Sequence, residues 1–589
     1  MKLKLLFLKT FFIVFTFLIL AFLFRWQIID HNYFSKLAEQ RFVEYVTSGE
    51  RGKIIAHDGT VLVYNENVWD VYVYKPELEI AEKIQKVKVN NESFEVQKQT
   101  RKEFVEKVAA ILNVFPQEIE EKINSDGNYI KIASQIDLST KNALEFLPGN
   151  SQSGYYLKGI NFEETFKRGY PNGTLASNIL GYLGYSDKQS LVGTHGIEQA
   201  WNGDLSPQSG YQKIEIDIDG NPIIAGESET LNYKNGSDIK LSIDPTIQSI
   251  LEKKLKEGKE KYQAENAIGI IMEPKTGDIK GMAVYPSYDP AKYSEVTDLK
   301  QLNNLAVSES YEPGSIGKVF TTAVAYDLGV ADEDTVVVES HPGCININEW
   351  KICNALKVPA KNLTVKTTLM TSDNIGAYGI AKLVGEENLK NYLRKFGLAQ
   401  SLNVGLAEEQ TEFYNFDRKW PEVELATSSF GQSYTLTALQ IVDAYAAIAN
   451  DGLRMKPKIV SEVVSEEGVK VIENKLIETV ISPEASQKTN ATLTKVFADN
   501  LKNTATRAQY DILSKYSLAG KSGTAQIPKK DGTGYEDNAV NSTYIGYDTS
   551  SEKSFVMLIK LTKPKIGRFA NNNVMPLWYD TFIELKDLL

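Results

Sequence analysis

The sequence predicts an α+β protein with several structural units behind one membrane-spanning helix. Its 589 residues are too many for one compact core, because domains typically hold about 100–200 residues. Segments with a helical apolar period predict helices, and runs rich in β-branched and aromatic residues predict strands. The helices are expected at 318–329, 364–384 and 436–450, and the clearest strands at 267–272 and 555–561.

The chain opens with an apolar segment, residues 5–24, interrupted only by Lys9 and two threonines. A helix of about 20 residues spans roughly 30 Å, the thickness of the hydrocarbon core of a lipid bilayer. Three lysines precede or open the run and only Arg25 follows closely, which favours a cytoplasmic tip at residues 1–4. A cleaved signal peptide is the alternative, but the run is long for one and no small-x-small site follows. We therefore expect a single-pass anchor in the cell membrane, with the rest of the chain on the outer face.

The part of the chain outside the membrane divides into two predicted domains. Residues 25–235 mix strand-like runs at 61–64 and 71–74 with a helical patch at 101–123 that Pro116 breaks in two. A turn-rich stretch then precedes a new apolar pattern, so we place a boundary directly after residue 235. The second domain is expected to span residues 236–589.

Composition narrows the classes of function. Lys and Arg total 65 against 76 Asp and Glu, a net charge of −11, so a protein that binds nucleic-acid phosphates is not expected. Two cysteines exclude a zinc site with four Cys ligands, and four histidines make a multi-histidine metal centre hard to build. We expect no metal and no other cofactor.

The sharpest chemical signal is Ser315 with Lys318, in the segment YEPGSIGK. At the start of a helix, two residues spaced i and i+3 lie on one face, one turn apart. A lysine amine can take the proton of a serine hydroxyl if its pKa is depressed, and this makes the serine a nucleophile. The N–H groups at a helix start can also stabilise a developing oxyanion.

Two further motifs follow Ser315 in order. The first is Ser372-Asp373-Asn374 and the second is Lys521-Ser522-Gly523-Thr524. A second serine can relay protons, an Asn amide can hold a substrate amide, and a lysine cation attracts a carboxylate. Gly523 would let a substrate backbone lie against a strand. Another Lys-Thr-Gly, at 275–277, precedes Ser315 within a predicted turn, and we interpret it as structural.

With this order of motifs the chain resembles class B penicillin-binding proteins, the membrane-anchored peptidoglycan D,D-transpeptidases of bacterial cell-wall synthesis. The resemblance covers nearly the whole chain. Residues 51–62 look like the family's R-G-x-I-x-D-R-x-G-x-x-L signature, departing from it at Ala56-His57, which puts local contacts there in doubt. The other matching segments are RGYP at 168–171, LGY at 180–182, GIE at 196–198, PSYDP at 286–290, GQ at 431–432 and AAIANDG at 446–452.

The resemblance implies a fold and a reaction. The fold is an antiparallel sheet flanked by helices, carried on an elongated N-terminal pedestal similar to the family's dimerisation domain. Ser315 would form an acyl-enzyme with the penultimate D-Ala of a stem peptide and release the terminal D-Ala. β-Lactams, which imitate D-Ala-D-Ala, would trap the same serine.

The resemblance also implies the roles of the other motif residues. Lys318 would be the base, while Ser372 and Asn374 would serve proton transfer and substrate positioning. Lys521, Ser522 and Thr524 would bind the substrate carboxylate, and the N–H groups of Ser315 and Thr524 would form the oxyanion hole.

The resemblance implies protein partners as well. No glycosyltransferase motif lies between the anchor and residue 235, so glycan polymerisation would need a separate membrane polymerase, together with division or elongation proteins. The Ser-x-Asn-Ile-Gly-Ala context of residues 372–377 and the chain length favour the division branch over elongation.

Three other functions fit parts of the sequence. One is a β-lactamase or penicillin sensor on the same fold. A β-lactamase, as a hydrolase, needs a group that activates water, and residues 385–391 carry acids but lack the Glu-x-x-Leu-Asn order. An inactive scaffold would not need the intact motif set. A Ser–His–Asp hydrolase is disfavoured because no histidine follows His341.

Cys344 and Cys353 flank an alternating apolar–polar run that can fold as a hairpin. Outside the cytoplasm, oxidising conditions favour a disulfide between them. Two alternatives stay open at this point. His341 could join both cysteines as zinc ligands, as some family members carry zinc near this segment, or both thiols could be free.

Overall fold

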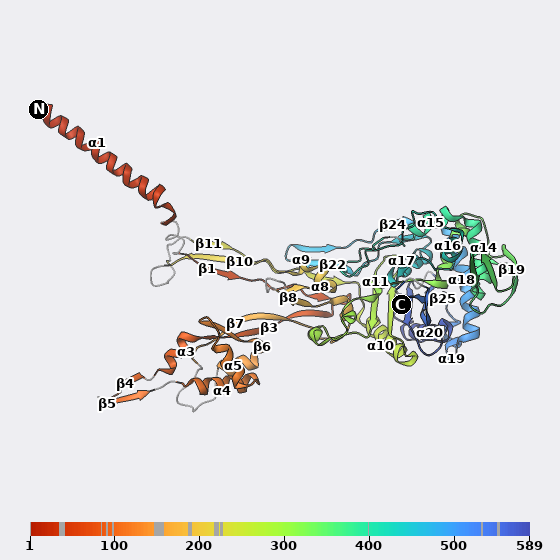
Figure 1. The fold of residues 1–589 in the computed structure, drawn as a ribbon, viewed down its shortest axis with the longest axis horizontal. Coiled ribbons are helices and arrows are strands. Elements are labelled where there is room, and N and C mark those ends of the chain that lie inside the picture. The colour runs from red at the N-terminus through yellow and green to blue at the C-terminus, as the bar shows by residue number, and fades with distance from the viewer. Residues whose placement is uncertain are drawn as a thin grey trace. The chain divides into compact units, whose positions relative to one another are not determined.

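The computed structural model describes residues 2–33, 42–83, 85–89, 92–96, 99–145, 158–185, 191–216, 223, 228–398, 400–529, 531, 534–550 and 554–589. Contacts divide the chain into two compact units (Figure 1). Unit 1 comprises Met1–Gly52, Asp204–Ser237 and Ser465–Gly468, and unit 2 comprises Lys53–Gly203, Asp238–Val464 and Val469–Leu589.

Unit 1 contains the apolar helix and a small sheet. Helix α1 (Lys2–Phe24) continues into a π-helical turn at Arg25–Ile29, and together they provide a span of 27 residues, Leu3–Ile29, long and apolar enough to cross a membrane. The apolar helix is thus present and longer than residues 5–24. Antiparallel pairing joins three strands, β1 (Phe42–Thr47), β10 (Gly210–Glu215) and β11 (Ser228–Leu231).

A long strand organises the first part of unit 2. Strand β3 (Val61–Tyr74) pairs antiparallel with β6 (Tyr129–Ile136) and β7 (Ile160–Gly169). The sequence predicted separate strands at 61–64 and 71–74, but the polar residues between them also pair with β7, so the strand is continuous. Polarity alone does not end a strand whose backbone groups find partners on a neighbour.

Two short helices cover this sheet, as predicted for residues 101–123. Helix α4 (Arg101–Leu112) begins where the Thr100 hydroxyl accepts the N–H of Glu103. Helix α5 (Pro116–Ile123) has proline at its first position, where no backbone N–H is needed. Their apolar faces pack with the sheet in a core that includes Val71, Val73, Phe104, Val108, Ile119 and Ile132.

The centre of the C-terminal part is a five-stranded sheet in the order β14-β13-β27-β26-β25, and every neighbouring pair is antiparallel. The two predicted strands at 267–272 and 555–561 become β13 and β27. The Lys-Thr-Gly at 275–277 lies in the turn between β13 and β14, as interpreted. The bounds are β13 (Asn266–Met272), β14 (Ile279–Tyr285), β25 (Leu518–Pro528), β26 (Tyr535–Asp548) and β27 (Val556–Thr562).

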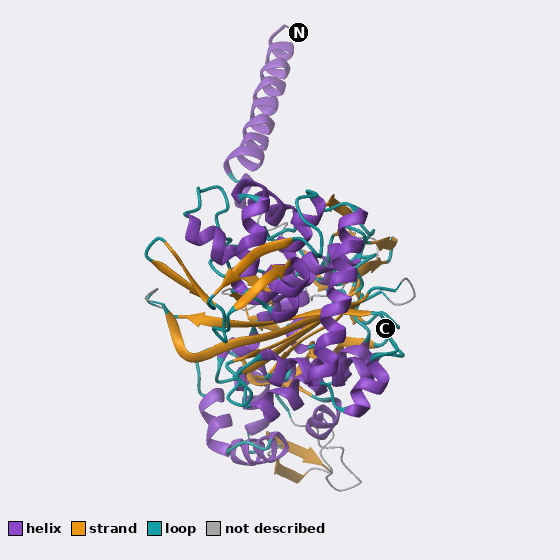
Figure 2. Ribbon diagram, turned by 90° about the vertical axis from the view of Figure 1, so that its right-hand side faces the viewer, coloured by secondary structure: helices purple, strands orange, loops and turns teal. Residues whose placement is uncertain are grey.

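Helices pack on both faces of this sheet (Figure 2). Tyr544 on β26 contacts the rings of Trp578 and Tyr579 on α20 (Val574–Leu585), and α10 (Pro245–Tyr262) joins the same core. Tyr547, three residues further along β26, contacts Tyr445 on α17 (Ala438–Ala449). Because side chains alternate along a strand, α17 lies on the opposite face. The predicted α+β fold, an antiparallel sheet flanked by helices, is confirmed.

The predicted helix 364–384 is wrong as one element. It is two helices, α13 (Val365–Thr371) and α14 (Asn374–Val384). Ser372 ends α13 with a φ of 56°, in the left-handed region, and Asp373 caps α14 by accepting the N–H groups of Ile375 and Gly376. The apolar period runs through both helices, so periodicity alone could not show the break.

The other helices and strands of the described residues are as follows. In unit 2 and at its borders, the helices are α3 (Lys75–Glu82), α6 (Leu138–Glu145), α7 (Ser177–Leu180), α8 (Gly196–Ala200), α9 (Asn202–Leu205), η2 (Pro290–Glu295), η3 (Leu299–Leu302), α11 (Leu305–Ser308), η4 (Gly314–Ile316), α12 (Gly317–Asp327), α15 (Glu386–Lys395), α16 (Glu422–Ser429), α18 (Pro483–Thr504), α19 (Arg507–Leu513) and η5 (Ala570–Asn572). The other strands are β2 (Ile54–Ile55), β4 (Gln85–Val89), β5 (Glu92–Val96), β8 (Leu183–Tyr185), β9 (Leu191–Gly193), β12 (Asp238–Leu241), β15 (Ser310–Tyr311), β16 (Val336–His341), β17 (Cys344–Ile347), β18 (Trp350–Cys353), β19 (Ala360–Thr364), β20 (Leu436–Thr437), β21 (Leu453–Met455), β22 (Val460–Ser465), β23 (Gly468–Val471) and β24 (Leu476–Thr479).

Candidate active site

Ser315 and Lys318 lie where the chain enters α12. Ser315 occupies the 3-10 turn η4, and Lys318 is in the first turn of α12. The Lys318 Nζ lies 2.6 Å from the Ser315 Oγ, although the lysine side chain is fully buried. The i, i+3 spacing therefore puts amine and hydroxyl in direct contact, as the sequence indicated.

Residues of the second motif, at the break between α13 and α14, contact the Lys318 amine. Lys318 Nζ donates to the backbone oxygen of Ser372 at 3.1 Å and to the Asn374 Oδ1 at 2.8 Å. The Ser372 Oγ lies 3.4 Å from the same nitrogen. A continuous helix would have carried the Ser372 carbonyl into the helical ladder, so the left-handed residue is what frees it to accept from Lys318.

Lys521 approaches Ser372 from the opposite side. Its Nζ lies 3.2 Å from the Ser372 Oγ and 3.1 Å from the Ser522 backbone oxygen. The Ser372 hydroxyl thus stands between two lysine amines, in a position to pass a proton from one to the other. Among the described residues β25 pairs only with β26, so its other edge is open beside Ser315 for an extended peptide.

Gly523 also allows a close approach within the protein itself. A Cβ at this position would lie 2.8 Å from the Pro313 backbone oxygen and 2.9 Å from a side-chain carbon of Ile316. Glycine is therefore needed so that the turn carrying Ser315 can approach β25. Ser522 and Thr524 alternate with it along the strand, and the Thr524 hydroxyl accepts the N–H of Ala570.

Burial depresses the pKa of both active-site lysines. Desolvation lowers the pKa of Lys318 well below its ordinary value, and the nearby Lys521 charge lowers it further, while Asp373 opposes the shift. Desolvation alone lowers the pKa of Lys521 to about 8. When only one of the two lysines is protonated, the positive charge is therefore on Lys521. As pH rises, Lys318 loses its proton first.

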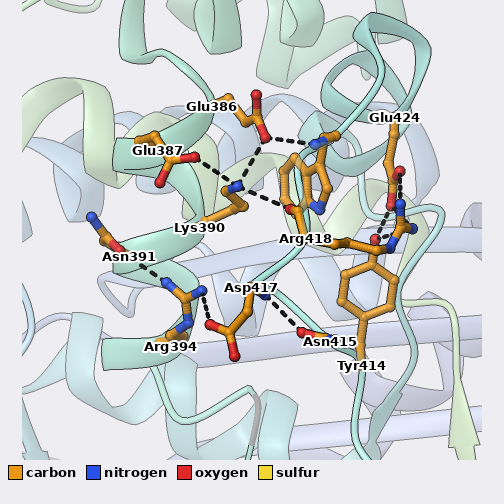
Figure 3. Close-up of polar contacts among 11 residues, drawn as sticks. Glu386, Glu387, Lys390, Asn391, Arg394, Tyr414, Asn415, Asp417, Arg418 and Glu424 are labelled. Carbon is orange, nitrogen blue, oxygen red and sulfur yellow. Dashed lines mark hydrogen bonds and ion pairs between the residues drawn. The ribbon is translucent and has the colours of Figure 1, made fainter.

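The acids at 385–391 are occupied in ion pairs, as Figure 3 shows. Glu386 accepts from Lys390 Nζ at 2.8 Å and from the N–H of Trp420 at 2.6 Å, and Glu387 pairs with the same lysine at 2.7 Å. The bond from Lys390 holds the pKa of Glu386 below its usual value, which makes it a weak base. The loop opposite is held by further pairs, Arg394–Asp417 and Arg418–Glu424.

The sequence pointed to His341 only as a possible zinc ligand and gave no role to Asn354, but both side chains contact Asp373. His341 Nε2 lies 3.0 Å from its Oδ2, and Asn354 Nδ2 donates to the same oxygen at 2.5 Å. The Cys353 backbone oxygen accepts from Asn374 Nδ2 at 2.9 Å. The only sequence signal was position, since all three residues lie in or beside the cysteine hairpin.

That hairpin is formed by β17 and β18, which pair Cys344 directly with Cys353. The structure joins the two sulfurs in a disulfide, with Cα atoms 4.1 Å apart. The bond leaves neither sulfur as a thiolate ligand, and His341 is directed at Asp373. A zinc site from these three residues does not match this arrangement.

A buried lysine beside a serine, next to the edge strand of a five-stranded antiparallel sheet, is the arrangement shared by penicillin-binding proteins and serine β-lactamases. Comparison with known families agrees. The penicillin-binding protein transpeptidase domain matches residues 267–579, and the penicillin-binding protein dimerisation domain matches residues 46–241. The chain belongs to the class B penicillin-binding proteins, and it is a serine D-Ala-D-Ala transpeptidase of peptidoglycan synthesis.

Individual proteins show the extent of this similarity. Stage V sporulation protein D of Bacillus subtilis (strain 168) is 28% identical over 534 residues, which cover 88% of this chain and 74% of that protein. Peptidoglycan D,D-transpeptidase FtsI of Buchnera aphidicola subsp. Schizaphis graminum is 30% identical over 451 residues, covering 75% and 72%. The crystal structure of penicillin binding protein 2X from Streptococcus thermophilus shares the fold, with a TM-score of 0.74 at 22% identity, covering 93% of this chain and 80% of that one.

Proposed function

We propose that this chain cross-links stem peptides through an acyl-enzyme on Ser315, on the outer face of the membrane and at the division septum. One observation carries the proposal: the buried Lys318 amine lies 2.6 Å from the Ser315 hydroxyl while two other acceptors take its N–H groups. Residues 25–235 would serve as the pedestal and residues 236–589 as the transpeptidase domain.

Lys318 acts as the base in its neutral form. A neutral amine has two N–H groups and one lone pair. The Ser372 carbonyl and the Asn374 Oδ1 accept the two N–H groups, which directs the lone pair at the Ser315 hydroxyl. The burial that lowers the pKa of Lys318 makes this neutral form more accessible.

In the acylation step, the Ser315 Oγ bonds to the carbonyl carbon of the penultimate D-Ala. The C–N bond to the terminal D-Ala breaks, and the serine proton passes by way of Lys318 and the Ser372 hydroxyl to the leaving amine. The backbone N–H groups of Ser315 and Thr524 stabilise the oxyanion. An acceptor amine from a second stem peptide then attacks the ester, forms the cross-link and returns the proton to Ser315.

Lys521 binds the terminal carboxylate of the donor peptide in its protonated form, with help from the hydroxyls of Ser522 and Thr524. A charged lysine with a pKa of about 8 is largely protonated at neutral pH. The open edge of β25 takes the peptide backbone as an added strand. β-Lactams occupy the same position, acylate Ser315 and inhibit the enzyme.

The N-terminal helix fits a single-pass membrane anchor. The lysines at its start favour residues 1–4 in the cytoplasm and the site outside. The sequence context of residues 372–377 favours septal synthesis, and a membrane glycan polymerase and division proteins are the partners expected there.

The test is cross-linking by the purified full-length protein, with a pentapeptide donor ending in D-Ala-D-Ala and an amine acceptor. The proposal predicts one D-Ala released for each new peptide bond, and neither product from Ser315→Ala. Hydrolysis of the donor without transfer to the acceptor, under acceptor excess, would favour a carboxypeptidase or sensor instead.

A further inference from the structure

Asp373 connects the active site to the disulfide hairpin. We propose that His341 and Asn354 are positioning residues which hold the Asn374 amide against Lys318, His341 through Asp373 and Asn354 through both Asp373 and the Asn374 backbone. The proposal rests on the assigned roles of Ser315 and Lys318. It gives a function to a buried histidine that the catalytic cycle does not otherwise use.

The two carboxylate oxygens of Asp373 face different partners. Oδ1 accepts the N–H groups of Ile375 and Gly376 and thereby fixes the start of α14. Oδ2 accepts from the Asn354 amide at 2.5 Å and lies 3.0 Å from His341 Nε2. Both Asp373 and His341 are 5% exposed, so the loss of one of these bonds leaves a buried carboxylate oxygen with fewer partners.

The protonation form of His341 follows from its second contact. The backbone N–H of Gly343 donates to His341 Nδ1 at 3.0 Å, so Nδ1 presents a lone pair. The ring proton is then on Nε2, where it is donated to Asp373. Both nitrogens are in use, so the histidine–aspartate pair cannot serve as a base for Ser315.

Asn354 and its neighbour Cys353 set the orientation of Asn374. The Asn354 Oδ1 accepts the Asn374 backbone N–H at 2.8 Å, and the Cys353 backbone oxygen accepts from Asn374 Nδ2 at 2.9 Å. With its nitrogen held by Cys353, the Asn374 amide must present Oδ1 to Lys318. A flipped amide would place two N–H donors against the amine, which has no acceptor to offer except its lone pair.

The position of the Asn374 amide affects catalysis, because the hydrogen bonds that Lys318 donates to the Ser372 carbonyl and to Asn374 Oδ1 direct its lone pair at Ser315. Losing the Asn374 oxygen would free one N–H of the amine and let the lone pair turn away from Ser315. Small errors in the alignment of a base cost large factors in rate. Substrate binding at Lys521 would change less, since this lysine contacts the Ser372 hydroxyl and the Ser522 backbone oxygen, whereas His341 and Asn354 bond to Asp373 and to the Asn374 backbone.

The experiment measures penicillin acylation of the full-length protein by stopped-flow, separating the acylation rate constant from the dissociation constant of the initial complex. For His341→Ala we expect the rate constant to fall about 10- to 100-fold with a nearly unchanged dissociation constant. His341→Gln keeps an N–H donor of similar reach and is expected to restore most of the rate. Ser340→Ala, at an exposed neighbour, is the matched control and should behave as wild type.

A second variant covers the case in which His341→Ala misfolds. Asn354→Asp preserves shape and the acceptor for Asn374 but sets a carboxylate against Asp373, so it too should slow acylation. Thermal unfolding of each variant reports its folding. Equal rates for His341→Ala, Asn354→Asp and wild type would overturn the proposal.

A double-mutant cycle with Asn374→Ala identifies the route. If His341 acts through Asn374, His341→Ala should cost little further in the Asn374→Ala background. The same loss in both backgrounds, or equal losses for His341→Ala and His341→Gln, would mean a general structural role and contradict the inference. If wild type itself is not acylated at Ser315, the proposed function fails instead.

Discussion

Lys318 and Lys521 stand on either side of the Ser372 hydroxyl, with their amines 3.4 and 3.2 Å from its oxygen. Two ammonium groups so close together in a buried site repel each other. The pair therefore holds one proton readily and a second with difficulty. In the proposed function one lysine is the base and the other the cation, and their titration belongs to the pair rather than to either residue.

The pH dependence of acylation follows from this division. Acylation needs Lys318 without its proton and Lys521 with it. The rate should rise as pH increases through the depressed pKa of Lys318 and fall as Lys521 deprotonates near its pKa of about 8. The second-order rate of penicillin acylation between pH 5 and 10 checks this. A rate that keeps increasing to pH 10 would mean that a charged Lys521 is not required.

An arginine in place of Lys318 tests whether this residue acts as a base or only supplies a positive charge. Lys318→Arg should abolish acylation, because arginine keeps the positive charge but does not give up its proton in proteins. Fluorescent penicillin labelling measures the effect. Lys275→Arg, in the exposed turn with the other Lys-Thr-Gly, is the matched control and should label normally. Labelling of Lys318→Arg at the control rate would remove Lys318 from the role of base.

Among the helices and strands, the break between α13 and α14 matters most for the site, because it brings the Ser372 carbonyl and the Asn374 amide to Lys318. Sequence reasoning found the Ser372–Asn374 motif through its order after Ser315. It gave 364–384 as one helical range and placed the motif between helical stretches, but it did not locate where the two helices end, because the apolar period continues through the break. The left-handed φ of Ser372 and the cap by Asp373 are local backbone features that periodicity does not record. For the same reason the contacts of His341 and Asn354 could not be predicted.

The hairpin of β17 and β18 supplies a prediction at this scale. The disulfide closes a loop with a sequence separation of 9, which in the chain-entropy model stabilises the fold by roughly 2–3 kcal/mol. Cys344→Ser should therefore lower the unfolding temperature. It should also slow acylation moderately, because the Cys353 carbonyl holds the Asn374 amide.

Mass spectrometry of unreduced protein checks the bond itself. A peptide pair joined through Cys344 and Cys353 is expected. Two thiols that alkylate without reduction, or that alkylate only after a chelator removes stoichiometric zinc, would contradict the disulfide.

For the whole molecule, the sequence predicted the features that depend on the order of motifs along the chain and on amino-acid composition. The apolar helix, the α+β class and the family all followed from patterns along the chain. The sheet order β14-β13-β27-β26-β25 joins strands from opposite ends of the domain, and no local pattern predicts such pairing. The approach of the Ser315 turn to Gly523 depends on that order and had to be observed.

Separating the anchor from the catalytic part tests the organisation of the chain. All the residues of the proposed mechanism lie in unit 2, while the apolar helix lies in unit 1. A variant without residues 1–33 should leave the membrane fraction and still be acylated by penicillin at an unchanged rate. Sedimentation and labelling measure the two properties. A truncated protein that stays with membranes after a carbonate wash would show a second membrane contact.

Ser315 is the proposed acylated nucleophile, and this assignment is tested most directly by the intact mass of the full-length protein after incubation with benzylpenicillin, followed by peptide mapping. We expect one penicilloyl group per chain on Ser315, persisting for long after free penicillin is removed, and no adduct on Ser315→Ala of equal thermal stability. An adduct that maps to another residue, or that forms equally on Ser315→Ala, would show that Ser315 is not the nucleophile.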